Sequence, residues 1–297
     1  MTHAHGSTAA AHRGRLAVVF TLALVTFLVE LVGGLLTNSL ALLADAGHLF
    51  SDVVGIGLAL GAIWVGARPA SSGRTFGYLR AEILAALVNA VLLFGVAAFV
   101  LIEAVRRSSA PPAIEATPML VVALGGLAVN AVSLWLLRDA QRASLNMRGA
   151  YLEVLGDLAG SAGVVIAAVV IGLTGWLPAD AVASAAIGLM ILPRAWALAR
   201  DALDILLEAT PKGVDLEAVR DHILEADGVI DVHDLHAWTI TSGMPVVSAH
   251  VVVEPGADPP RILDALCRCL SGDFDIEHST FQLESADRRR LEEATHA

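Results

Sequence analysis

The sequence predicts a membrane-embedded, all-α domain of six helices, followed by a small α+β domain. Of the 297 residues, 56% are hydrophobic and only 16% are charged. In soluble domains about a quarter of all residues are charged. The charge is also unevenly placed. Residues 1–209 hold 12 basic and 13 acidic side chains, and residues 210–297 hold 7 and 17. The second segment is therefore expected to be water-exposed, and its acidity argues against nucleic acid as a partner.

Six apolar stretches lie in the first two thirds of the chain, each near the roughly 20 residues that cross a bilayer. They cover residues 16–36, 39–67, 81–105, 116–137, 149–177 and 179–198. A cleaved signal peptide is the alternative for the first stretch, but its apolar run exceeds the usual ~7–15 residues. We expect an N-terminal tail over 1–14, a transmembrane domain over 15–209, a cytoplasmic domain over 210–290 and a C-terminal tail over 291–297.

Arginines gather before the first stretch, between the second and third, and between the fourth and fifth. They are Arg13, Arg15, Arg68, Arg74, Arg80, Arg138, Arg142 and Arg148, whereas Arg106 and Arg107 go against this pattern. Because basic loops stay in the cytoplasm, both termini are predicted to be cytoplasmic. Nearly all basic residues are arginine and not lysine, which indicates a bacterial protein. The expected location is therefore the bacterial plasma membrane.

Ionisable residues inside the apolar stretches concentrate in the second and the fifth. Asp45, His48 and Asp52 share one helix face, and Glu153 and Asp157 lie one turn apart on another. If these helices face each other, one imidazole and three carboxylates could converge as four ligands, which suits a tetrahedral ion such as Zn²⁺. The alternative is that these groups only pair for stability or reach toward the headgroups.

Three further glutamates, Glu30, Glu82 and Glu103, lie near the ends of apolar stretches. We expect them to reach the membrane surface or to pair with loop arginines.

The acidic segment changes to short amphipathic elements. A helix is predicted over 215–226, strands over 229–240 and 246–254, a helix over 258–270 and a strand over 278–283. This order, αββαβ, is typical of an α+β domain. Its two cysteines, Cys267 and Cys269, form neither a disulfide framework nor a CxxC zinc motif. Two interpretations stay open for the histidines in or beside its predicted strands: they bind a metal ion, or they only form hydrogen bonds.

Several motifs, in order, make this chain similar to one family. They are NSLALLADAGH at 38–48 followed by Asp52, FGYLRAE at 76–82, NMRGAY at 146–151 leading to Asp157, HDLHAW at 233–238 and HSTFQLE at 278–284. With them, the sequence resembles the cation diffusion facilitator family of metal/proton antiporters.

The resemblance implies that His48, Asp52 and Asp157 belong to the intramembrane transport site. Asp45, on the same helix face as His48 and Asp52, is expected at the access to this site. Zinc-transporting members usually have histidine where this chain has Glu153. Glu153 is expected to be a ligand here, and three carboxylates with one imidazole form a harder site that favours manganese or magnesium more than a mixed set does.

For the cytoplasmic segment, the resemblance implies a ferredoxin-like domain that forms a homodimer. His233, His250, His278 and Glu284 are the candidates for a metal site there.

The expected function is export of a divalent cation from the cytoplasm in exchange for protons, with no enzymatic activity. Zn²⁺ is the expected cargo and a regulatory ligand, and Cd²⁺, Co²⁺, Mn²⁺ and Fe²⁺ are the alternatives. A passive channel and an intramembrane metallohydrolase are the competing functions. Against a metallohydrolase, the chain has no HExxH motif to hold a catalytic zinc. Against a channel, four charged ligands would bind the ion too tightly for fast conduction.

Overall fold

The computed structural model describes residues 6–139 and 145–293. It confirms the predicted architecture of six long helices followed by a small α+β domain. The long helices are α1 (Gly6–Thr37), α2 (Leu40–Gly66), α3 (Ala81–Ser109), α4 (Ala116–Leu137), α5 (Leu145–Thr174) and α6 (Pro178–Leu206). Each contains a stretch long and apolar enough to cross a membrane. The chain divides into two compact units, one with most of α1–α6, the other with residues 61–87 and the segment from Arg200 onward.

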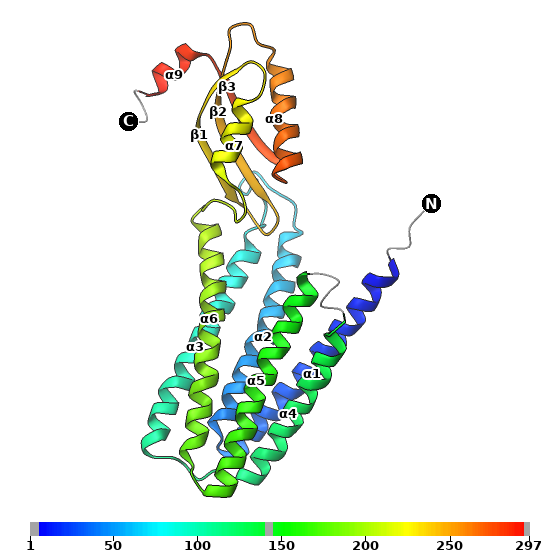
Figure 1. Ribbon diagram of the computed structural model, residues 1–297, viewed down its shortest axis with the longest axis vertical. Helices are drawn as coiled ribbons and strands as arrows, with labels where there is room; N and C mark the ends of the chain where they lie inside the picture. Colours follow the sequence, from blue (N-terminus) through cyan, green and yellow to red (C-terminus); the bar gives the residue numbers. More distant parts are fainter. Residues whose placement is uncertain (1–5, 140–144, 294–297) are drawn as a thin grey trace. The chain divides into compact units, whose positions relative to one another are not determined.

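The helical unit, coloured blue to yellow-green in Figure 1, has a core rich in alanine. Buried alanines come from five of its helices and include Ala41, Ala97, Ala123, Ala168 and Ala195. Large apolar side chains such as Leu60, Phe99 and Leu173 are more than 60% exposed instead. This distribution suits a lipid environment, where helices associate through close packing of small residues rather than through hydrophobic burial.

The start of α2 is fixed by a residue from a distant part of the chain. Asn38 takes a left-handed conformation, with φ of 56°, between α1 and α2, and asparagine tolerates this conformation well. The buried carboxylate of Asp180, in the first turn of α6, accepts hydrogen bonds from Ser39 Oγ at 2.6 Å, Leu40 N at 2.8 Å and Ala41 N at 3.1 Å. Asp180 thus satisfies backbone N–H groups that a helix start leaves unpaired.

We expect Asp180→Ala to destabilise the helical unit. Each buried donor left without an acceptor costs roughly 1–3 kcal/mol, so the apparent melting temperature of the detergent-solubilised protein should fall by several degrees. Asp201→Ala, also on α6, is the matched control, because Asp201 is half exposed and its one ion pair among the described residues is with Lys212. Equal melting temperatures for the two variants would contradict the capping role of Asp180.

The second unit follows the predicted order and adds one helix that the sequence did not predict. Its elements are α7 (Leu216–Leu224), β1 (Val229–Thr239), β2 (Pro245–Val253), α8 (Pro259–Asp273), β3 (His278–Glu284) and the additional α9 (Ala286–Glu293). The sheet has the order β1-β2-β3, with β1 and β2 antiparallel and β2 and β3 parallel. Asp215 caps α7 as expected and accepts hydrogen bonds from the backbone of the first turn.

One face of this sheet packs against α7 and α8, which lie beside it in Figure 1. Val232 of β1 and Val251 of β2 share a core with Ile223 of α7 and Leu266 of α8. Side chains alternate between the two faces of a strand. The residues next to these valines, His233 and His250, therefore lie on the other face, away from the core.

Candidate metal centres

The first centre lies between α2 and α5 of the helical unit. His48 and Asp52 of α2 and Asp157 of α5 each offer a ligand atom, and these atoms lie within 4.8 Å of one another. His48 Nε2 is 3.3 Å from Asp157 Oδ1 and 3.9 Å from Asp52 Oδ2. The three side chains are at most 14% exposed. The two predicted polar stripes thus face each other at this point.

Part of the binding capacity of these three residues is not used within the protein. His48 Nδ1 is buried and has no hydrogen-bond partner within the described part of the chain. Asp52 Oδ1 and Asp157 Oδ1 are also buried, and each faces a single nitrogen atom, Arg194 Nη2 at 3.0 Å and His48 Nε2 at 3.3 Å. Burying polar atoms without partners is costly. A divalent cation would remove that cost, and one imidazole with two carboxylates is a donor set that Zn²⁺ accepts.

Glu153, the fourth expected ligand, is not brought into this cluster. Its Oε1 accepts a hydrogen bond of 2.6 Å from Arg194 Nη2 of α6. The same guanidinium lies 3.0 Å from Asp52 Oδ1 and 3.4 Å from His48 Nε2. Arg194 was not among the site residues predicted from the sequence. It is the one basic residue within the sixth apolar stretch, 179–198, and this position could have indicated a functional role.

Asp45 lies deeper and beside the cluster. It is 2% exposed and accepts a hydrogen bond of 2.9 Å from Ser161 Oγ, which in turn accepts one of 3.1 Å from Asn130 Nδ2. A Cβ on Gly160 would come within 2.9 Å of Asp45 Oδ1, so α5 needs glycine there to approach α2 so closely.

A cavity of about 310 Å³ opens next to these groups. Its lining includes Asp45, His48, Glu153 and Arg194, contributed by α2, α5 and α6. Asp45 and His48 thus line the same cavity. The access role of Asp45 stays a prediction.

The expectation for the glutamates near span ends is wrong for Glu30 and right for Glu103. Glu103 pairs with Arg107, at 2.9 Å. Glu30 is only 1% exposed, and neither of its carboxylate oxygens has a hydrogen-bond partner among the described residues. Its burial follows from the packing of α1 on α4, where Gly126 leaves room for the Glu30 carboxylate.

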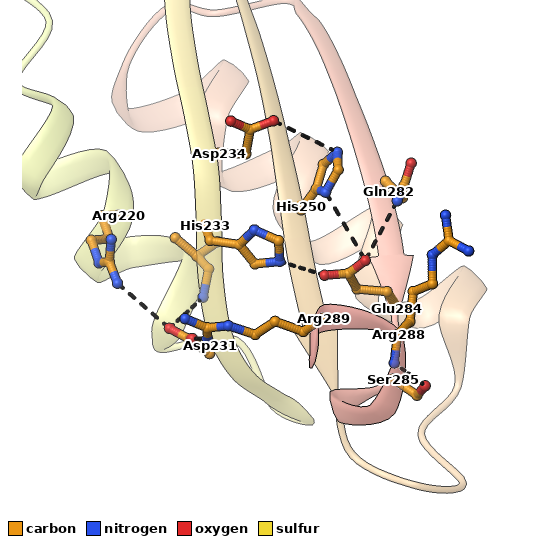
Figure 2. Close-up of polar contacts among 11 residues, drawn as sticks. Arg220, Asp231, His233, Asp234, His250, Gln282, Glu284, Ser285, Arg288 and Arg289 are labelled. Carbon is orange, nitrogen blue, oxygen red and sulfur yellow. Dashed lines mark hydrogen bonds and ion pairs between the residues drawn. The ribbon is translucent and has the colours of Figure 1, made fainter. Parts of the chain in front are cut away.

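The second centre lies on the open face of the three-stranded sheet. His233 of β1, His250 of β2 and Glu284 at the end of β3 offer ligand atoms within 4.8 Å of one another. Figure 2 shows both imidazoles turned toward the Glu284 carboxylate. His233 Nε2 donates to Glu284 Oε1, and His250 Nδ1 lies 4.0 Å from Glu284 Oε2. The two rings meet edge to face with centroids 5.1 Å apart.

Strand register explains this convergence. His233 and His250 are direct partners across the antiparallel pair, and Glu284 pairs with Val252, two residues beyond His250. One extra residue between His233 and His236 makes a bulge in β1. Within the bulge, Asp234 has a φ of 51°, and its Oδ2 lies 4.0 Å from His250 Nε2 (Figure 2).

The structure does not bring His278 into this cluster. His278 begins β3 and Glu284 ends it, and six steps along a strand span about 20 Å. His278 is exposed, and so is His236, whose Nε2 bonds Asp234 Oδ1 at 3.1 Å. Burial, together with the charges of Asp273 and Glu225, raises the pKa of the Cys269 thiol. Neither Cys267 nor Cys269 belongs to a metal-ligand cluster among the described residues.

Comparison with known proteins matches both units. The family model of the cation efflux transmembrane domain matches residues 16–207, and that of the cation efflux protein cytoplasmic domain matches residues 211–286. The chain is 47% identical to the metal cation efflux system protein CzcD of Cupriavidus metallidurans, over 91% of this chain and 86% of that protein. It is 40% identical to the zinc transporter ZitB of Escherichia coli, over 96% of this chain and 93% of that protein.

A third relative is the cadmium, cobalt and zinc/H(+)-K(+) antiporter of Bacillus velezensis, 38% identical over 96% of this chain and 93% of that protein. Among solved structures, the metal-bound C-terminal domain of the C. metallidurans CzcD transporter is 42% identical. The match covers 24% of this chain and 99% of that one, with a TM-score of 0.23. With both family models matched in order and relatives aligned over nearly the whole length, this chain is an integral membrane protein that belongs to the cation efflux family, the cation diffusion facilitators.

Proposed function

We propose that this protein exports a divalent metal cation, Zn²⁺ first, from the cytoplasm in exchange for protons. The observation that carries the proposal is the His48–Asp52–Asp157 cluster, which joins α2 and α5 inside apolar helices. Ionisable groups at such depth are costly and mark ion pathways. The names of the relatives, which include zinc, cadmium and cobalt, support this class of cargo.

Proton exchange follows from the chemistry of the ligands. A metal ion binds the neutral imidazole and the ionised carboxylates, so loading of His48, Asp52 and Asp157 releases the protons they carry. When the site opens to the other side, protons and metal compete for the same atoms. Alternation between the two openings then couples the two flows without a separate proton pathway. The antiporter name of the B. velezensis relative supports this coupling.

In this proposal both termini lie in the cytoplasm, as the arginine distribution predicts. The second unit then senses metal through His233, His250 and Glu284 and pairs with the same unit of a second copy. A chain truncated at Thr210 that transported normally at all metal concentrations would contradict a regulatory role for this unit.

The test is transport by the purified protein in lipid vesicles with an acidic lumen. We expect Zn²⁺ to accumulate in the vesicles, and accumulation to stop when an ionophore removes the pH gradient. Mn²⁺ is followed in parallel, because a further carboxylate ligand from Glu153 would make the site harder. Cd²⁺ is followed because the name of the B. velezensis relative includes it. Movement of Mn²⁺ without Zn²⁺ would preserve the mechanism but contradict zinc as the cargo.

Two further outcomes would contradict the antiport itself. Metal flux that is indifferent to the pH gradient would indicate a channel. Bound zinc without any flux would favour a metallohydrolase. Vesicles without protein give the background rate for both measurements.

A further inference from the structure

Arg194 places a permanent positive charge beside the membrane metal site. Its Nη2 is 2.6 Å from Glu153 Oε1 and 3.0 Å from Asp52 Oδ1, so a single guanidinium joins α6 to both α5 and α2. Its Nη1 lies 3.4 Å from His48 Nε2, the ring nitrogen that faces Asp157. Arginine stays protonated at any physiological pH. The group therefore acts as a fixed cation that no change in protonation can remove.

This cation contacts two residues of the ligand cluster, Asp52 and His48, and the Glu153 carboxylate that is left outside it. Asp52, Asp157 and Glu153 would otherwise place three negative charges close together in a medium of low dielectric, where their repulsion is strong. The guanidinium offsets that repulsion in the metal-free protein. A divalent ion within a few ångströms of it would be repelled for the same reason, so Arg194 and the metal cannot both occupy this position at low cost.

We propose that Arg194 is an internal counter-cation that competes with the transported metal. It holds Asp52 and Glu153 while the site is empty, and it must withdraw before the ion can use them. Its withdrawal frees Glu153 to approach the three clustered ligands as the fourth. Its return weakens ion binding and promotes release. This inference rests on the proposed function and assigns Arg194 as a positioning residue that sets the affinity of that site.

The surroundings of Arg194 leave room for this movement. Its side chain is 40% exposed, compared with 14% for Asp52, and it lines the 310 Å³ cavity together with Glu153. The preceding residue, Pro193, lies inside α6 and has no N–H to donate to the carbonyl one turn earlier. The helix is therefore less restrained at this turn than elsewhere.

The test is equilibrium binding of Zn²⁺ to the full-length protein in detergent. The membrane site is measured as the binding that wild type shows and Asp157→Asn lacks. We expect Arg194→Met to lower the Kd of this site by at least about tenfold, since the competing charge is gone. Arg194→Gln, a second charge-free variant, should behave alike, and Arg194→Lys should remain near wild type. Adding Glu153→Gln to Arg194→Met should remove most of the gain.

A gain of affinity is not a result that structural damage produces. Arg200→Met, the same change elsewhere on α6 where the arginine pairs with Asp204 at 3.8 Å, should leave the Kd unchanged. An unchanged or higher Kd in both Arg194→Met and Arg194→Gln would overturn the inference while leaving the proposed function standing. Equal binding by wild type and Asp157→Asn would instead show that the membrane site binds no zinc, and would overturn the proposed function with it.

Discussion

Replacement of Asp157 by asparagine should abolish metal transport while the protein still folds and inserts into the membrane. Asp157 is the member of the cluster that α5 contributes, 3.3 Å from His48 Nε2 of α2, and it is 5% exposed. Asparagine keeps the shape but loses the charge that a divalent ion requires. Changes in residues that only support metal ligands already cost about 10–100-fold in affinity or activity. We therefore expect a loss of more than about 100-fold for this direct ligand.

The measurement is the rate of zinc accumulation in vesicles, normalised to the amount of inserted protein. Asp201→Asn is the matched control, because Asp201 lies on α6 outside the cluster and pairs with Lys212. Size-exclusion chromatography in detergent would verify that both variants fold. Transport at a comparable rate by Asp157→Asn and Asp201→Asn would contradict the site, whatever the coupling ion proves to be.

The helical spacing of the ionisable residues was sufficient to predict which of them share one face of a helix. His48 and Asp52 lie four residues apart, as do Glu153 and Asp157, so each pair was predicted to share a face. Apolar length likewise predicted all six spans, because a bilayer requires about 20 residues per crossing. These features are local, and local spacing is visible in the sequence.

Contacts between helices were not predictable in the same way. Arg194 reaches Glu153 across 41 positions of the chain, and nothing in its own neighbourhood indicates this partner. Glu30 was expected near the membrane surface, yet α4 covers it because Gly126 allows a close approach. Which face of a helix meets which neighbour depends on packing, and that information is spread over the whole bundle.

The side-chain cluster on the three-stranded sheet shows the same limit. His233, His250, His278 and Glu284 were all grouped through the family resemblance. The structure brings His233 and His250 together because they pair across neighbouring strands. The parallel register of β3 places His278 beside Val246 instead, four residues before His250. Glu284, at the other end of β3, is the residue that this register brings to the two imidazoles.

Replacement of Glu284 by glutamine should therefore abolish metal binding at the proposed site on the sheet. Glu284 is 6% exposed and is the acidic member of the cluster with His233 and His250. Without its charge, two imidazoles remain as strong ligands, and zinc sites usually need three or four. Of the two clusters among the described residues, the Asp157→Asn protein keeps only this one intact. We expect the number of Zn²⁺ ions it binds to fall from one per chain to none when Glu284→Gln is added.

Binding should also stabilise the folded unit only when Glu284 is present. A ligand at about 100 times its Kd contributes about 2.7 kcal/mol to the folded state, so zinc should raise the apparent melting temperature of the Asp157→Asn protein and leave that of the double variant unchanged. His278→Ala, on the same strand but about 20 Å away, is the control and should keep both the bound ion and the shift. If His278→Ala lost the ion while Glu284→Gln kept it, the ligands would have to come from another arrangement of the strands. The register of β2 and β3 places Glu284 beside the two imidazoles and His278 away from them. The two variants together therefore test both this register and the metal site that depends on it.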